Sequence, residues 1–200
     1  MDYAKPTQAR AIETERRFLQ AFRELLQEKA FAQTTVDEIA MRAGLHRGAF
    51  LKRFGSKKNA LLTLYSQYCE KALDVVAKIH AELPQIDSVH AVCEWMSREL
   101  ERIQTEDFSA NRAMHEIFLE ELQTDAGTKR IFLAGVDLMR AVQKRYLSDH
   151  PCTDTGAFAA TQMLVTLSYN QVIKATPAMP TNPQVRHRLI ADCLVRALII

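Results

Sequence analysis

The sequence lacks the long apolar run that a membrane-spanning helix requires. No stretch approaches the roughly 18 uninterrupted apolar residues of such a helix, and the opening segment MDYAKPTQARAIETERR contains no apolar run at all. The 200 residues are nevertheless 48% apolar, which is too much for a disordered chain and enough to build a buried core. We therefore expect a folded, soluble and cytoplasmic protein that does not use a membrane.

Cysteines are few, and their spacing excludes two kinds of structural site. Cys69, Cys93, Cys152 and Cys193 lie far apart, without a CxxC pair and without a histidine-cysteine cluster at zinc-site spacing. Neither a disulfide framework nor a structural metal is indicated. We expect reduced thiols, either in the core or at the surface.

The sequence also lacks the motifs of common enzyme classes. There is no nucleophile elbow, no glycine-rich phosphate loop, no HExxH motif and no pair of carboxylates at a catalytic spacing. Glu120 and Glu121 are adjacent, and we expect them on a solvated helix face. We expect neither catalysis nor a cofactor, and turnover of any substrate by the isolated second part of the chain would overturn that expectation.

Acidic residues are absent between Glu38 and Glu70. This interval holds six basic residues, which are Arg42, Arg47, Lys52, Arg53, Lys57 and Lys58. Residues 1–65 carry a net charge of +5 and residues 66–200 a net charge of −3, which predicts a polyanionic partner for the first part alone. A basic run by itself is more often a solvated surface than a binding site, so the interpretation depends on the helical pattern around it.

The basic interval has the pattern of two short helices joined by a glycine turn. Apolar residues at helical spacing predict a preceding helix over about 10–29. Thr34 and Thr35 provide a hydroxyl to cap a second helix, which ends near Gly44 because glycine readily adopts positive φ. A third helix over about 47–54 places Phe50 and Phe54 inward and leaves a basic outer face. This is the helix-turn-helix arrangement that inserts a helix into the major groove of DNA.

The rest of the chain also has the pattern of helices. Ser56 is expected to cap a long fourth helix, which ends near residue 83 because Pro84 follows. Further helices are predicted over about 88–104, 109–122, 126–148, 155–175 and 184–199. No segment shows the alternation of a strand, and there is no internal repeat. We therefore predict an all-α protein.

Residues 34–62, TTVDEIAMRAGLHRGAFLKRFGSKKNALL, resemble the TetR family of bacterial transcriptional regulators. The motif of that family reads roughly TTVxxIAxxAGVSxGxxYxxFxSKxxLL. The positions in register are Thr34, Thr35, Val36, Ile39, Ala40, Ala43, Gly44, Gly48, Phe54, Ser56, Lys57, Leu61 and Leu62. Two positions depart from the motif: Leu51 replaces a tyrosine that usually contacts the DNA backbone, and His46 replaces a serine or threonine cap.

The resemblance implies a three-helix DNA-binding head and a larger helical bundle. On this basis we expect a DNA-binding domain over 1–56, with its helix-turn-helix at about 35–54, and a ligand-binding and dimerisation domain over 57–200. The implied function is that of a repressor, which binds a pseudo-palindromic operator as a homodimer and is released by a small hydrophobic or amphipathic effector. The alternative is a DNA-binding architectural protein, or one controlled by a protein partner, whose second domain is packed solid.

Site residues follow from the motif and from the chemistry of DNA. The expected DNA-binding residues are Thr34, Thr35, Arg42, His46, Arg47, Gly48, Ala49, Leu51, Lys52 and Lys57. Gly48 permits a close approach to the bases, while Arg47 or Lys52 could bond guanine or a phosphate, and Ala49 could contact a thymine methyl group. Lys57 lies at the start of the fourth helix, where its charge and the free helix-terminal amides together suit a phosphate.

Candidates for an effector pocket and for a dimer interface lie in the second part of the chain. The pocket candidates are Trp95, Met96, Asn111, His115, Phe118, Met139 and Gln162, although ordinary core packing is the commoner role for any one of them. The dimer candidates are Phe158, Thr161, Val165, Ser168, Leu189 and Cys193, which are on the last two helices. Burial within one subunit is the alternative explanation for these dimer candidates.

Overall fold

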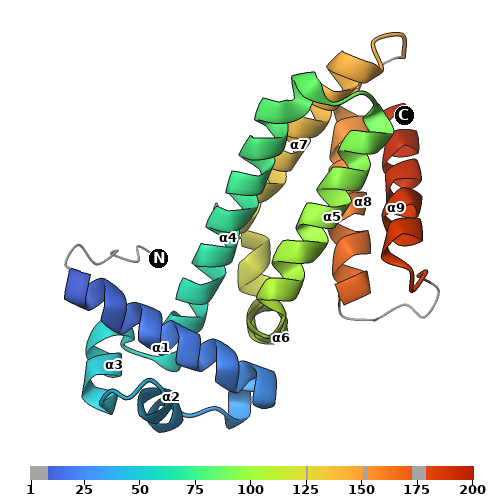
Figure 1. The fold of residues 1–200 in the computed structure, drawn as a ribbon. Coiled ribbons are helices and arrows are strands. Elements are labelled where there is room, and N and C mark those ends of the chain that lie inside the picture. The colour runs from blue at the N-terminus through green and yellow to red at the C-terminus, as the bar shows by residue number, and fades with distance from the viewer. Residues whose placement is uncertain (1–8, 125, 151–152, 173–178) are drawn as a thin grey trace. The chain divides into compact units, whose positions relative to one another are not determined.

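A computed structural model describes residues 9–124, 126–150, 153–172 and 179–200, without the side chains of 118–124 and 170–172. In these residues the chain is all α, as predicted (Figure 1). The helices are α1 (Ala9–Glu28), α2 (Val36–Arg42), α3 (Arg47–Phe54), α4 (Lys57–Glu82), α5 (Val89–Glu106), α6 (Phe108–Thr124), α7 (Ala126–Tyr146), α8 (Asp154–Val172) and α9 (Pro183–Leu198). Each of them was predicted from the sequence, whereas the 3₁₀ turns Phe31–Gln33 and Leu83–Gln85 were not. The predicted end of α8, at residue 175, lies outside the described residues.

None of the described helices is both long enough and apolar enough to cross a membrane.

The chain divides into two compact units by contact. The head unit comprises residues 1–68 and 107–122, and the body unit comprises residues 69–106 and 123–200. Helix α4 therefore begins in the head unit and ends in the body unit, while α6 groups with the N-terminal helices. This partition by contact differs from the functional domains 1–56 and 57–200, which remain a prediction.

Aromatic rings fill the core of the head unit and fix α3 against α1. Phe18 and Phe50 are fully buried, and Phe54 is 5% exposed. The Phe18 ring meets the Phe50 ring edge-on at a centroid distance of 5.3 Å, and Phe50 and Phe54 are 4.9 Å apart. Such ring pairs stabilise a core beyond the area that they bury. The inward face of α3 is therefore set by its two phenylalanines, as predicted.

A capping box and a glycine turn define α2. The Thr35 hydroxyl accepts a hydrogen bond from the Glu38 amide (3.2 Å), and the Glu38 carboxylate accepts one from the Thr35 amide (2.9 Å). This confirms the predicted threonine cap. Gly44 has φ +63°, and Arg17 of α1 donates to the carbonyl oxygens of Ala43 (2.5 Å) and Gly44 (3.3 Å). Helix α1 thus braces the turn that sets the angle between α2 and α3.

The body unit is built around α5, α7, α8 and α9, which run side by side (Figure 1). Aliphatic residues and methionines dominate its core. Gly156, near the start of α8, packs so closely that an added Cβ would lie 3.0 Å from the carbonyl oxygens of Ala197 and Leu198. The Gln143 side-chain amide donates to the Leu198 carbonyl oxygen (2.7 Å). A side chain of α7 thus provides a hydrogen-bond donor to a carbonyl group at the C-terminal end of α9.

Candidate DNA-binding site

Helix α3 presents a small and open face to solvent. Gly48 is exposed, and an added Cβ there would meet nothing within 4 Å. Leu51 is 37% exposed, Lys52 is exposed and Ala49 is half-buried. A face without bulky side chains at its start lets a helix backbone approach base edges closely. The predicted contact residues of α3 are therefore on its outer side.

His46 is the N-cap residue of α3, but its side chain makes no capping hydrogen bond. Only its backbone carbonyl oxygen serves the helix, accepting from the amides of Ala49 (2.9 Å) and Phe50 (3.3 Å). The departure from a serine or threonine cap therefore leaves the exposed His46 side chain uninvolved in helix capping.

The basic interval contains no acidic residue in the sequence, but in the fold acidic side chains from neighbouring helices contact it. On α3, Arg47 Nη1 donates to Asp37 Oδ2 of α2 at 2.6 Å. Arg53 Nε donates to Glu15 Oε2 of α1 at 2.5 Å, with Glu15 itself buried. The positive charge of the interval is consequently smaller at the surface than the sequence indicates. Among the three basic residues of α3, Lys52 alone has no hydrogen-bond or ion-pair partner among the residues that the structure describes.

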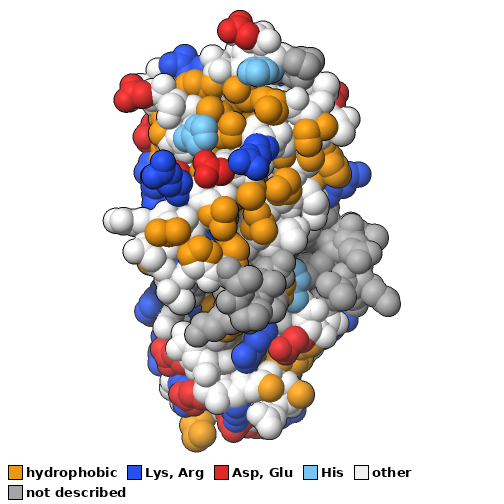
Figure 2. All heavy atoms as spheres, turned by 90° about the vertical axis from the view of Figure 1, so that its right-hand side faces the viewer, with side chains coloured by type: hydrophobic (Ala, Val, Ile, Leu, Met, Phe, Trp, Pro, Cys, Tyr) orange, Lys and Arg blue, Asp and Glu red, His pale blue; other side chains and the backbone are white. Residues whose placement is uncertain are grey.

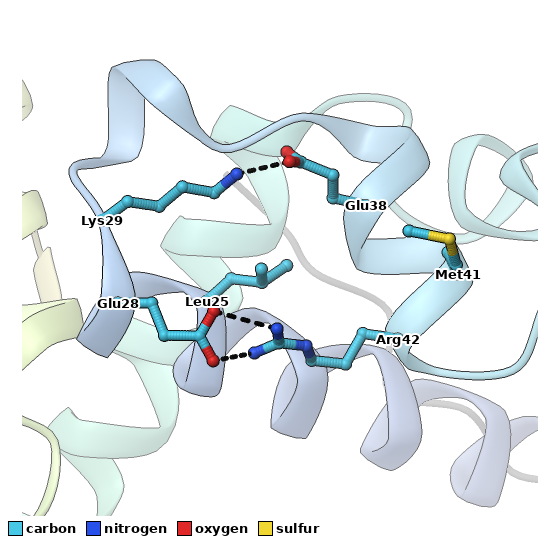
Figure 3. Close-up of a pocket in the computed structure, with 6 residues that line it drawn as sticks. All are labelled: Leu25, Glu28, Lys29, Glu38, Met41 and Arg42. Carbon is cyan, nitrogen blue, oxygen red and sulfur yellow. Dashed lines mark hydrogen bonds and ion pairs between the residues drawn. The ribbon is translucent and has the colours of Figure 1, made fainter.

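A groove runs between the C-terminal end of α1 and helix α2 (Figure 3). Arg42 forms a two-pronged ion pair with Glu28, whose Nη2–Oε2 distance is 2.9 Å. Lys29 Nζ donates to Glu38 Oε1 at 2.5 Å, and this bond, together with those from Thr35, lowers the pKa of Glu38 to about 2. All four charges are paired within the groove, so Arg42 is directed toward α1 and not held out toward a ligand.

Lys57 is bound to the loop before α2. Its ammonium donates to the carbonyl oxygens of Phe31 (2.6 Å) and Thr34 (2.5 Å), and it lies 4.1 Å from the centre of the Phe31 ring. Burial lowers the pKa of Lys57. Because an ammonium has three N–H donors, one is left for a phosphate. Thr34 is 1% exposed and its hydroxyl donates to the Ala30 carbonyl oxygen (3.2 Å), so Thr34 is directed inward while Thr35 is exposed.

Four of the pocket candidates lie in the body unit. Met96 (5% exposed) and Met139 (fully buried) are part of its core, and Trp95 packs half-buried against that core. Gln162 is exposed and donates to the hydroxyl of Thr166 (3.3 Å). The two methionines thus have the core role that was the commoner expectation.

The other pocket candidates lie in the head unit, on α6. Asn111 is 8% exposed, and its Nδ2 has no hydrogen-bond partner among the described residues. His115 is half-buried, and burial lowers its pKa. The side chain of Phe118 lies outside what the structure describes. A buried amide without a partner is unfavourable unless something bonds it, so Asn111 keeps its place as a candidate.

Hydrophobic side chains gather on the face formed by α8 and α9 (Figure 2). The exposed fractions are 53% for Phe158, 39% for Val165, 53% for Val185 and 43% for Leu189. Cys193 of α9 is a free, half-buried thiol. Several large apolar side chains exposed together on adjacent helices are typical of an interaction surface.

Two of the dimer candidates are not on that face. Thr161 and Ser168 are 3% and 1% exposed, so they point into their own unit. The Thr161 hydroxyl donates to the Ala157 carbonyl oxygen (2.9 Å), and its methyl group lies against Gly135 of α7. Thr161 and Ser168 follow Phe158 and Val165 by three residues each, a spacing that predicts one shared helix face, but the structure buries the first two and exposes the second two. We therefore remove Thr161 and Ser168 from the proposed interface.

A buried polar cluster in the head unit was not predicted from the sequence. Arg23 Nε donates to Asp107 Oδ1 (2.8 Å), and Arg23 Nη2 donates to Gln67 Oε1 (2.8 Å). The Asp107 side chain is only 5% exposed. These contacts join α1 and α4 to the residue that precedes α6. They connect residues 44 and 84 positions apart, a separation at which the sequence contains no pairing signal.

A second polar cluster that was missed lies between α5 and α9 in the body unit. Arg186 Nη2 donates to Glu101 Oε1 (2.7 Å), and His187 Nε2 lies 3.1 Å from Glu101 Oε2. His187 Nδ1 is 2.9 Å from the Ser97 hydroxyl oxygen. Burial lowers the pKa of His187, although the nearby Glu101 carboxylate acts in the opposite direction. The cluster anchors the first turns of α9.

Comparison with known proteins shows what the N-terminal region and the fold are similar to. Residues 18–63 match the sequence model for "Bacterial regulatory proteins, tetR family". No curated protein matches the chain. Many solved structures share its fold. One is a protein of Mesorhizobium loti assigned to the TetR-family transcriptional regulators, with 15% identity, a TM-score of 0.73, and coverage of 96% of this chain and 98% of that one.

Two further structures with this fold have known roles. NalD of Pseudomonas aeruginosa is the secondary repressor of the MexAB-OprM multidrug efflux pump, and it is 16% identical with a TM-score of 0.64, over 94% of this chain and 98% of that one. FadR of Bacillus subtilis, solved with stearoyl-CoA, is 14% identical with a TM-score of 0.58. The match covers 92% of this chain and 97% of FadR. At such identities the likeness concerns the fold.

The fold and the site together define a helix-turn-helix DNA-binding regulator. Its α2 and α3 have the expected caps, turn and core contacts, and α3 has an open outer face. Residues 18–63 match the sequence model of the TetR family of bacterial transcriptional regulators, and the described residues have the fold of proteins assigned to that family.

Proposed function

We propose that this protein is a repressor that binds a pseudo-palindromic operator as a homodimer and releases it when a small, largely apolar effector binds the domain predicted over residues 57–200. The observation that carries DNA binding is the open outer face of α3, which includes Gly48 and Leu51, and where Lys52 is exposed with no ion-pair partner among the described residues. A cationic side chain beside a close-approaching helix supplies both phosphate attraction and access to base edges.

Selection of bound duplexes from a random pool tests DNA binding, at about 150 mM salt because non-specific contacts weaken there. We expect enrichment of an inverted repeat whose half-sites are about one helical turn apart, near 34 Å. Loss of enrichment in the Lys52→Ala variant, with an unchanged circular dichroism spectrum, would show that α3 contacts the DNA. Retention of all sequences alike would favour the alternative, an architectural DNA-binding protein.

The apolar face of α8 and α9 supports the dimer. A symmetric dimer uses the same patch on both subunits, and this patch exposes Phe158, Val165, Val185 and Leu189. We expect a dimer in sedimentation at micromolar concentration, and a monomer for Phe158→Glu/Leu189→Glu. The matched control is Ile12→Glu, which alters a similarly exposed apolar residue of α1 (49%) and is expected to leave the dimer intact.

The proposed effector is a small amphipathic molecule. Asn111 supports such an effector, because a buried amide with no hydrogen-bond partner among the described side chains suits the polar end of an amphipathic molecule. Relatives of this fold include FadR with bound stearoyl-CoA, so long-chain acyl-CoA and free fatty acids are suitable first probes. We expect a raised melting temperature and release of the selected operator. If neither changes with any amphipathic probe, control by a protein partner becomes the better proposal.

A further inference from the structure

The start of the recognition helix carries an ion pair whose acid comes from the neighbouring helix. Arg47 is the first residue of α3, and Asp37 lies in the first turn of α2. The bond between Arg47 Nη1 and Asp37 Oδ2 is 2.6 Å long, and the two side chains are 57% and 65% exposed. The pair is therefore on the surface that the proposed function assigns to DNA.

An exposed carboxylate is unfavourable on a surface that approaches phosphates, because like charges repel at the rim of an interface. Such a residue has a clear role if it holds a cation for a specific contact. The bond to Asp37 uses one guanidinium nitrogen of Arg47. The remaining N–H donors keep the planar geometry that bonds guanine.

The exposure of the pair is consistent with this role. Exposed ion pairs are weak, typically up to about 1 kcal/mol, so a correctly placed base can compete with the carboxylate for Arg47. A random phosphate has to compete with it as well, which reduces binding to non-operator DNA. Lys52 on the same helix has no such partner in the described part of the chain, and it can bind phosphates without this competition.

We propose that Asp37 is a positioning residue for sequence discrimination: its carboxylate orients Arg47 for one base and limits the use of Arg47 for non-specific phosphate contact. This inference rests on the proposed DNA-binding function. It predicts that removing the carboxylate charge strengthens binding to arbitrary duplexes and weakens discrimination.

The test compares wild type with Asp37→Asn on three duplexes by fluorescence anisotropy from 50 to 300 mM salt. The duplexes are the selected operator, the operator with the base pair read by Arg47 changed, and an unrelated sequence. For Asp37→Asn we expect a salt slope on the unrelated duplex that is steeper by about one unit, because Arg47 then neutralises a phosphate. We also expect the preference for the correct base pair to fall about fivefold or more.

Three controls separate this role from simpler ones. Asp137→Asn makes the same charge change in the body unit, at an aspartate with the same 2.6 Å contact to an arginine and 69% exposure, and it is expected to change neither quantity. Asp37→Glu keeps the carboxylate charge, so its discrimination between base pairs should lie between that of wild type and that of Asp37→Asn. In the Arg47→Ala background, Asp37→Asn should no longer steepen the salt slope, since the two residues act as one unit.

The outcomes distinguish failure of this inference from failure of the proposed function. If wild type binds no duplex, the DNA-binding proposal itself fails. If wild type binds its operator but Asp37→Asn changes neither slope nor discrimination, Asp37 has no positioning role. If Asp37→Asn lowers operator affinity equally with and without Arg47, the carboxylate reads a base directly and the positioning role is overturned. A lower melting temperature with unchanged discrimination would assign Asp37 to the stability of α2 alone.

Discussion

The buried ion pair between Arg23 and Asp107 should stabilise the head unit far more than an exposed pair on the same helix. The Arg23 and Asp107 side chains are 23% and 5% exposed, and Arg23 also bonds Gln67. Arg23→Met removes both hydrogen bonds and leaves the Asp107 carboxylate buried without its arginine. Removing one partner of a buried pair costs about 3–5 kcal/mol. We expect about 3 kcal/mol, because Arg23 keeps some solvent contact and Asp107 makes a further interaction.

Urea unfolding at fixed protein concentration, followed by circular dichroism, measures this cost. The matched control is Arg16→Met, which breaks the Arg16–Glu13 pair of α1, where the side chains are 66% and 53% exposed; its midpoint should not move. In the double variant Arg23→Met/Asp107→Asn no unpaired charge is buried, so most of the lost stability should return. If Arg23→Met shifts the urea midpoint no more than Arg16→Met does, burial does not make the Arg23–Asp107 pair more stabilising than an exposed pair.

Three further predictions concern the cap of α2, the lysine of α4 and the histidines. Thr35→Ala should destabilise the head by about 1 kcal/mol in urea unfolding, because it removes the capping bond; an unchanged midpoint would contradict the cap. Lys57→Ala should lower the melting temperature and reduce the salt slope of DNA binding by about one unit, and a lower melting temperature with an unchanged slope would leave Lys57 a purely structural role. His115 and His187 have lowered pKa values, so the unfolded chain binds more protons and stability should fall as pH decreases through about 6.5. His187→Gln should flatten this decrease in thermal unfolding from pH 8 to 5.5, and a profile identical to wild type would exclude His187 as a contributor.

Helix positions could be predicted because the signals that define them are local. Thr35, Gly44 and Ser56 each act on amides or dihedral angles within a few residues, and the structure shows the Thr35 cap, the positive φ of Gly44 and the Ser56 hydroxyl accepting from the Asn59 amide (3.1 Å). The inward phenylalanines of α3 follow equally from helical spacing. Such features need no knowledge of which helices are neighbours.

Charge at the surface could not be predicted in the same way. The basic interval contains no acid in the sequence, yet Asp37 and Glu15 reach Arg47 and Arg53 from α2 and α1. A charge count along the sequence cannot register partners that packing brings from outside the interval. The same reason hid the Arg23–Asp107 pair.

The register of α8 was misjudged for a different reason. The helix has apolar or small residues on most of its sides, so the sequence does not indicate which face is buried. Thr161 and Ser168 were assigned to the outer face with Phe158 and Val165, and the structure places the first two inside. Small polar residues can be buried in a helix because their hydroxyls bond the preceding turn, as Thr161 does with Ala157.

The most direct test of the central proposal, a dimer that holds two half-sites at once, is the effect of half-site spacing on operator affinity. Insertion of five base pairs between the half-sites rotates one of them by about half a turn. The proposed dimer then engages only one half-site, so affinity should fall to that of an isolated half-site. Equal affinity for the original and the expanded operator would contradict a dimeric helix-turn-helix regulator.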